Sequence, residues 1–115
     1  MKSYKNFQVA IYCPAPFLKD VALQEIEEGL NFFNQHLRIS KVYLETHRGG
    51  VDVEKEKVLK VKEFFEKEGV KASGGITTTI SLENDEFRDL RIFNTFCYTN
   101  PEHLKKLVEI VEFTA

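Results

Sequence analysis

Apolar residues follow two different spacings along the chain, and the change of spacing predicts strands separated by helices. Residues 7–13 are apolar at nearly every position, which is typical of a strand covered on both faces in a parallel sheet. Pro14 and Pro16 predict the end of this strand, because proline cannot donate to the hydrogen-bond ladder of a sheet. Residues 18–37 then place apolar side chains three and four positions apart, which predicts one long amphipathic helix.

The middle of the chain repeats this order. Residues 42–44 predict a second buried strand, and Gly49 and Gly50 predict a turn after it. Asp52 is expected to cap the helix that follows, since an aspartate at such a position accepts a hydrogen bond from a free backbone amide. This helix is expected to run to about residue 68 and to stop at Gly69.

The last part of the chain predicts one more repeat and an added strand. Residues 70–73 predict a third strand that leads into 74–80, and residues 81–91 predict a polar loop. Residues 92–98 predict a further strand, paired as a hairpin with residues 76–80. Asn100 followed by Pro101 predicts the start of a last helix, because this pair supplies a cap and a first-turn proline.

Strand, helix and strand recur at intervals of about thirty residues, which is the length of a βαβ crossover. The repeats are joined without a linker or a low-complexity segment, so a single domain, residues 1–115, is expected. The predicted class is α/β. The expected fold is a partial (β/α) barrel of about three βα units, with a mostly parallel sheet and an added hairpin-like strand.

The composition fits a globular domain, with 43% hydrophobic and 30% charged residues. The net charge of −2 comes from acids and bases that are mixed along the helices, so no basic face for nucleic acid is expected. No apolar run approaches the ~20 residues that cross a membrane, and the first residues carry no secretory signal. These features predict a cytoplasmic protein without nucleic-acid or membrane partners.

The two cysteines, Cys13 and Cys97, lie far apart in strand-like surroundings. We expect both to be buried thiols of a reducing compartment, because free cysteine is among the residue types most often buried. A disulfide and a nucleophilic role are the alternatives. Neither cysteine has a CxxC partner, and the three histidines show no ligand spacing, so no metal or other cofactor is expected.

Polar side chains come directly after the predicted parallel strands. The carboxyl ends of such strands meet at one rim of the sheet, where α/β proteins bind their ligands. A carboxylate beside an arginine or a histidine can bind sugar hydroxyls or acids, or move protons. We therefore predict a catalytic residue, Glu45, and a set of substrate-binding residues, Tyr12, His47, Arg48, Thr77 and Tyr98.

Simpler interpretations stand beside these predictions. Glu45 at a strand end can pair with Arg48 or a nearby lysine without any catalytic role. His47 can be a hydrogen-bonded loop residue rather than a base or a ligand. Arg48 with the two glycines after it can bind an anion at the helix start, although the full dinucleotide and P-loop patterns are absent.

The stretch Tyr-Leu-Glu-Thr-His-Arg-Gly-Gly at 43–50, with Gly-Gly-Ile at 74–76 and Phe-Cys-Tyr-Thr-Asn-Pro at 96–101, carries a family resemblance. It resembles the N-terminal part of glycoside-hydrolase-like TIM-barrel proteins, many of which are bacterial. The resemblance spans nearly the whole chain but corresponds to about three βα units of an eight-unit barrel of ~250 residues. It implies a carbohydrate ligand at the C-terminal rim of the barrel.

Glycosidic cleavage normally uses two carboxylates that flank the bond. The predicted rim offers only Glu45, so the resemblance implies a carbohydrate-related domain that is inactive on its own. Its uncovered strands predict a homo-oligomer, or association with a missing C-terminal barrel half. The alternative function is a non-enzymatic α/β module that self-associates or binds a partner through its open sheet.

Overall fold

An open four-stranded sheet forms the centre of the computed structural model, which describes residues 4–80 and 95–115. Two strands lie parallel to the central strand on its two sides, and a short one pairs antiparallel with its end. This mixed sheet with alternating helices confirms the predicted α/β class, and the described strands do not close into a barrel. The central strand is β2 (Ile39–Arg48), its parallel neighbours are β1 (Val9–Cys13) and β4 (Lys71–Ile76), and the short strand is β3 (Val51–Asp52).

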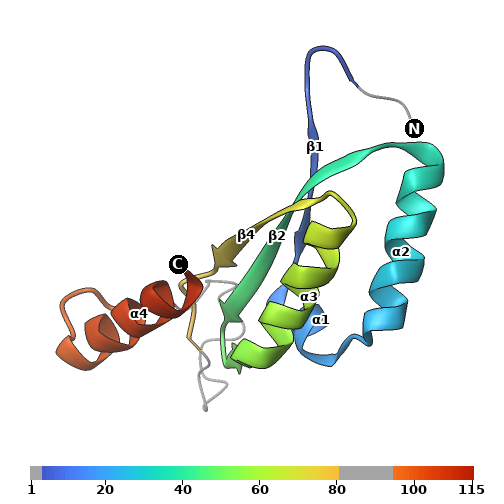
Figure 1. Ribbon diagram of the computed structural model, residues 1–115. Helices are drawn as coiled ribbons and strands as arrows, with labels where there is room; N and C mark the ends of the chain where they lie inside the picture. The colour runs from blue at the N-terminus through green and yellow to red at the C-terminus, as the bar shows by residue number, and fades with distance from the viewer. Residues whose placement is uncertain (1–3, 81–94) are drawn as a thin grey trace, which may run out of the picture.

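Two helices connect the parallel strands and lie on the same side of the sheet (Figure 1), α2 (Leu23–His36) and α3 (Lys55–Lys67). Their apolar stripes meet the alternate β2 side chains Val42 and Leu44 in one hydrophobic core. Gly69 ends α3 with a φ of 78°, as predicted for a C-terminal glycine. The other buried members of this core include Ile26, Leu30, Val61 and Phe65.

The side chains that alternate with Val42 and Leu44 along β2 point to the opposite face of the sheet, which we call the open face. Lys41, Tyr43 and Glu45 alternate with the core residues along β2. Their register partners bring Tyr12 of β1 and Ser73 of β4 to the same face. The open face therefore carries polar and aromatic side chains, whereas the face under α2 and α3 is apolar.

A β-bulge changes the direction of the β2 side chains near the end of the strand. Glu45 pairs with Gly75, but His47 pairs with the next β4 residue, so Thr46 has no partner of its own. After the bulge Thr46 and His47 lie toward the last helix, α4 (Pro101–Thr114), and Thr46 Oγ1 is 2.6 Å from Thr114 Oγ1. The bulge thus divides the end of β2 between two sides of the sheet.

The single helix predicted for residues 18–37 is wrong, because the chain forms α1 (Ala15–Asp20) and then α2. The break falls at Val21 and Ala22, which are both extended. Glu25 accepts a hydrogen bond from the Ala22 amide at 3.0 Å, and Lys57 of α3 donates to the Val21 carbonyl. These two polar partners satisfy backbone groups that an unbroken helix would have paired internally.

The predicted cap at Asp52 is also wrong. Asp52 belongs to β3, and α3 begins after Glu54, whose side chain makes no capping hydrogen bond. The second strand is longer than the expected residues 42–44, so Glu45 and Arg48 lie inside β2 rather than after it. A hairpin turn at Gly49, with a φ of 57°, then leads into β3.

The predicted hairpin strand is reduced to one bridge in the described residues. Residues 81–91, expected to be a loop, and residues 92–94 of that strand lie outside them. Thr79 and Thr95 form an isolated antiparallel bridge, and residues 97–99 turn toward α4. The start of α4 is as predicted, since the Asn100 side chain accepts from the amides of the first turn.

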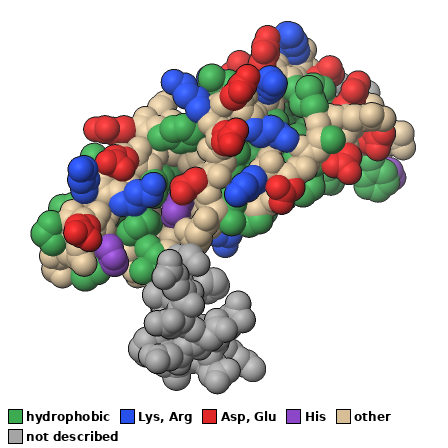
Figure 2. Space-filling view, turned by 90° about the horizontal axis from the view of Figure 1, so that it is seen from below, with side chains coloured by type: hydrophobic (Ala, Val, Ile, Leu, Met, Phe, Trp, Pro, Cys, Tyr) green, Lys and Arg blue, Asp and Glu red, His purple; other side chains and the backbone are tan. Residues whose placement is uncertain are grey.

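Acidic and basic side chains are interspersed over the face seen in Figure 2, without a gathering of one sign. Within residues 4–80 and 95–115, no helix combines the length and the apolar character that a membrane crossing requires.

Candidate functional site

The carboxylate of Glu45 is the centre of the candidate site. Its side chain is fully buried, yet both oxygens accept hydrogen bonds. Oε1 accepts from the Ala15 amide and from Arg48 Nε, each at 2.8 Å. Oε2 accepts from Arg48 Nη2 at 3.0 Å, from Thr77 Oγ1 at 2.7 Å and from the Tyr12 hydroxyl. Arg48 binds the carboxylate as a fork, which is the strongest geometry for this pair.

These donors keep Glu45 ionised. Burial alone would raise the pKa of Glu45, but the hydrogen bonds from Arg48, Ala15, Tyr12 and Thr77 lower it to about 2. The same pairing raises the pKa of the Arg48 guanidinium. Burial, together with the hydrogen bond to Glu45, raises the pKa of Tyr12. At neutral pH the site is therefore a carboxylate without a proton, flanked by two donors that keep theirs.

The predicted ion pair of Glu45 with Arg48 is confirmed, and the structure brings Tyr12 and Thr77 to the same carboxylate. Arg48 and Tyr12 are 40% and 47% exposed, so both present part of their side chains to solvent. Such an arrangement can offer oriented donors to hydroxyl-rich or anionic ligands. The catalytic role of Glu45 itself stays a prediction.

Tyr12 reaches across β2 to β4, and a glycine makes this possible. A Cβ on Gly75 would lie 3.1 Å from the Tyr12 hydroxyl oxygen, closer than ordinary packing allows. The Tyr12 ring stacks on Tyr43 with a centroid distance of 6.4 Å, and Lys41 Nζ lies 4.5 Å from the Tyr43 centroid. Tyr43 was missing from the predicted site, although strand alternation from Glu45 places it on the same face.

His47 is not part of this cluster, because the bulge turns it toward α4. Its side chain is buried, and both ring nitrogens have partners. Nδ1 lies 2.7 Å from Asp52 Oδ1, and Nε2 lies 2.8 Å from the Thr79 carbonyl oxygen. The simpler expectation for His47 was a hydrogen-bonded loop residue. The hydrogen bonds fit that expectation, but the residue lies in strand β2 rather than in a loop.

The last predicted site residue, Tyr98, is not bonded to this cluster. Tyr98 is 61% exposed in the turn before α4, and no hydrogen bond joins it to Glu45. Cys13 is a buried free thiol as expected, and burial, followed by the charge of Glu45, raises the pKa of Cys13 to about 11. The expectation for Cys97 is wrong, because its thiol is free but exposed.

Arg48 does not stand at a helix start, since the turn at Gly49 leads into β3 and α3 begins only at Lys55. The expected anion site therefore lacks the helix N-terminus on which it depended. Within the described ranges, no three His, Cys, Asp or Glu side chains gather as a metal site would require.

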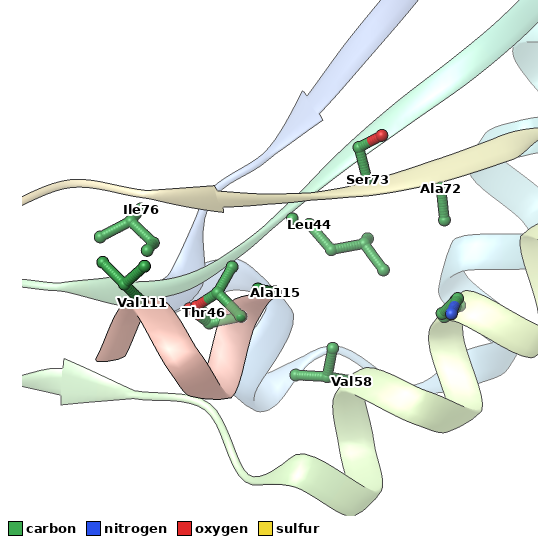
Figure 3. A pocket seen from close by; sticks show the side chains of 11 residues that line it. Leu44, Thr46, Val58, Ala72, Ser73, Ile76, Val111 and Ala115 are labelled. Carbon is green, nitrogen blue, oxygen red and sulfur yellow. Dashed lines mark hydrogen bonds between the residues drawn. The ribbon is translucent and has the colours of Figure 1, made fainter. Parts of the chain in front are cut away.

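A cavity of about 510 Å³ lies on the helix-covered side of the sheet, between α3, α4 and β4 (Figure 3). Leu44 and Val58 point into it from β2 and α3, and Val111 closes it from α4. The cavity is separated from the Glu45 cluster by the sheet itself. We place the candidate site at Glu45 because charge and hydrogen-bond donors converge there, whereas the cavity is lined mainly by apolar side chains.

Comparison with known proteins adds two findings. The family described as "Probable glycosyl hydrolase, catalytic domain" matches residues 1–115. An uncharacterized protein of the archaeon Saccharolobus solfataricus is 34% identical over 70 residues, which is 61% of this chain and 12% of that protein's length. No solved structure gives a significant match. Because the family match covers the whole chain, the chain belongs to the family of "Probable glycosyl hydrolase, catalytic domain" proteins.

Proposed function

We propose that this chain forms the first three βα units of a larger (β/α) barrel, and that the cluster around Glu45 takes part in carbohydrate recognition. β1, β2 and β4 are parallel and adjacent in chain order, as successive strands of such a barrel are. The cluster lies toward the carboxyl ends of these strands, where barrels bind their substrates. Membership of a glycosyl hydrolase family supports a carbohydrate ligand.

Within this cluster we propose that Glu45 orients ligand-binding groups rather than transferring a proton. A general acid needs a proton at the working pH, and the pKa of Glu45 is lowered to about 2. Both Glu45 oxygens are buried and already accept hydrogen bonds from protein donors, so a ligand would reach the exposed parts of Arg48 and Tyr12 first. The rings of Tyr12 and Tyr43 supply an adjacent aromatic surface for a sugar ring.

We further propose that this chain alone does not cleave glycosides. Cleavage needs a second carboxylate beside the bond. In the described part of the chain, the strand positions that share a face with Glu45 are not acidic; they hold Ala10, Tyr12, Lys41, Tyr43, Lys71, Ser73 and Gly75.

The observation that carries this proposal is the set of five hydrogen bonds that the buried Glu45 carboxylate accepts. The test is ligand binding. We expect gluco-, manno-, xylo- and galacto-oligosaccharides, titrated at millimolar concentration, to include a ligand that shifts the NMR signals of Tyr12, Tyr43 and Arg48. Glu45→Gln should weaken that binding about tenfold or more, which corresponds to ~1.4 kcal/mol. Glu63→Gln, on the exposed surface of α3, is the matched control.

Tyr43→Ala tests the same surface without removing a buried charge, and should also weaken binding. A folded Glu45→Gln variant that binds as tightly as the wild type would exclude the orienting role. Signal shifts confined to α2 or α3 would exclude the proposed location.

One further observation favours a second candidate, the non-enzymatic module. In the described residues β1 and β4 each pair only with β2, so each has a free edge. On α4, next to the cavity of Figure 3, three apolar side chains are about half exposed, Leu104, Val108 and Val111. Such edges and side chains are suited to association with another chain.

A further inference from the structure

His47 connects two segments that lie on either side of it in space. Its Nδ1 contacts Asp52 of β3 at 2.7 Å, and its Nε2 contacts the carbonyl oxygen of Thr79, beyond the end of β4, at 2.8 Å. The His47 carbonyl also accepts from the Thr77 amide at 3.0 Å. Gly49, in the adjacent turn, donates its amide to Thr79 Oγ1 at 2.7 Å.

Both partners of the imidazole are acceptors. A backbone carbonyl has no proton to give, and an ionised carboxylate has none either. A neutral imidazole carries one proton and would leave one of these two short contacts as a repulsion between lone pairs. Only a ring with a proton on each nitrogen can donate to Asp52 and to Thr79 at the same time.

We infer that His47 is a positioning residue that carries a proton on each ring nitrogen in the folded protein and thereby fixes the segment 77–79. The Phe96 ring packs against the imidazole in a tilted arrangement, with a centroid distance of 5.6 Å. The segment it fixes contains Thr77, whose hydroxyl donates to Glu45. This inference concerns the order of the segment and does not depend on the ligand that the cluster binds.

The charged groups around His47 are of both signs. β3 contributes Asp52, and α4 contributes Lys106, whose Nζ is 4.0 Å from Asp52 Oδ2, and Glu109, which lines the same cavity. On β2 itself, Glu45 and Arg48 form a closed pair on the other side of the bulge. The remaining titratable group nearby, His103 of α4, is separated from His47 by the Phe96 ring.

Nitrogen-15 NMR of the imidazole rings tests the inference directly in the full chain. At neutral pH we expect two protonated nitrogens for His47. Asp52→Asn is the decisive variant, because an asparagine amide can donate a hydrogen bond to an unprotonated Nδ1 and is therefore compatible with a neutral ring. In this variant His47 should be neutral, with its proton on Nε2 facing Thr79.

A neutral His47 in the wild type at neutral pH would overturn the inference. An imidazolium that persists unchanged in Asp52→Asn would overturn it too, because the carboxylate would then not be the reason for the second proton.

Discussion

At the scale of single residues, the chemistry of this chain depends on pairings that the order of residues does not display. The ion pair of Glu45 with Arg48 could be predicted, since the two residues are three positions apart at a strand end. The donors Tyr12 and Thr77 come from the neighbouring parts of the fold, and only the parallel register brings them to Glu45. The separation of His47 could not be predicted, because the bulge follows from main-chain pairing.

Acid titration gives a prediction for Glu45. The pKa of an unfolded glutamate is ~4.3, and the fold lowers the pKa of Glu45 to about 2. Its ionised form therefore stabilises the fold fully above the unfolded value, and this stabilisation is lost as the pH falls toward the folded value. We expect the wild type to lose about 2 kcal/mol of unfolding free energy between pH ~5 and pH ~2, a figure reduced for the exposure of Arg48.

Urea unfolding measured across this pH range checks the prediction. Glu45→Gln removes the titrating group, so its unfolding free energy should be lower at neutral pH and should vary less with pH. Parallel pH profiles for the two proteins would mean that Glu45 is not the group that the fold keeps ionised.

At the scale of elements, strand and helix bounds were predicted correctly where apolar spacing or a capping residue sets them. They were predicted wrongly where a polar contact with another element sets them. The strand at Val42, the stop at Gly69 and the cap at Asn100 follow from local rules and are present. The break after Asp20 is stabilised by Lys57 of another helix. The strand position of Asp52 depends on its pairing with β2. Neither contact has a signal in the local sequence.

Helix α4 is held against the sheet at a glycine, and this contact gives a prediction. A Cβ on Gly74 would lie 2.4 Å from Thr114 Cγ2 and 3.0 Å from the Thr114 carbonyl oxygen. Gly74→Ala should therefore push the end of α4 away and lower the unfolding free energy by about 1–3 kcal/mol. Thermal unfolding and amide exchange in α4 measure both effects.

Gly29 of α2 provides the matched control, since nothing lies within 4 Å of the position that its Cβ would take. Gly29→Ala should raise the unfolding free energy by about 0.5–1 kcal/mol through helix propensity. A Gly74→Ala variant as stable as the wild type would contradict the close docking of α4.

At the scale of the whole molecule, the sheet is a layer with helices on one side. α2 and α3 cover one face of the sheet (Figure 1). Among the described strands, the outer edges of β1 and β4 have no strand partner. The class of the fold could be predicted from its repeats, because each βα unit has its own apolar period. A closed barrel requires contacts between more units than these strands provide.

A measurement of the oligomeric state tests whether a second copy of the chain covers these edges. We expect the chain to form dimers or larger species in light scattering after size-exclusion chromatography, with a mass that rises with concentration. Lysine substitutions at Val108 and Val111, which are half exposed on α4, should shift the distribution toward monomer. The matched control is a lysine at Leu59 of α3, which is exposed to a similar degree. A monomer at all concentrations would exclude association of this chain with itself.

Two consecutive glycines leave only the main chain of β4 between Tyr12 and the last helix. Gly75 receives Tyr12 on one side of β4, and Gly74 receives Thr114 on the other. Main-chain atoms alone separate these two contacts. A shift of the Tyr12 ring would therefore act directly on the backbone of β4, because neither glycine has a side chain that could move instead. A reporter group near the C-terminal turn of α4 would consequently sense a displacement of Tyr12, although the sheet lies between them.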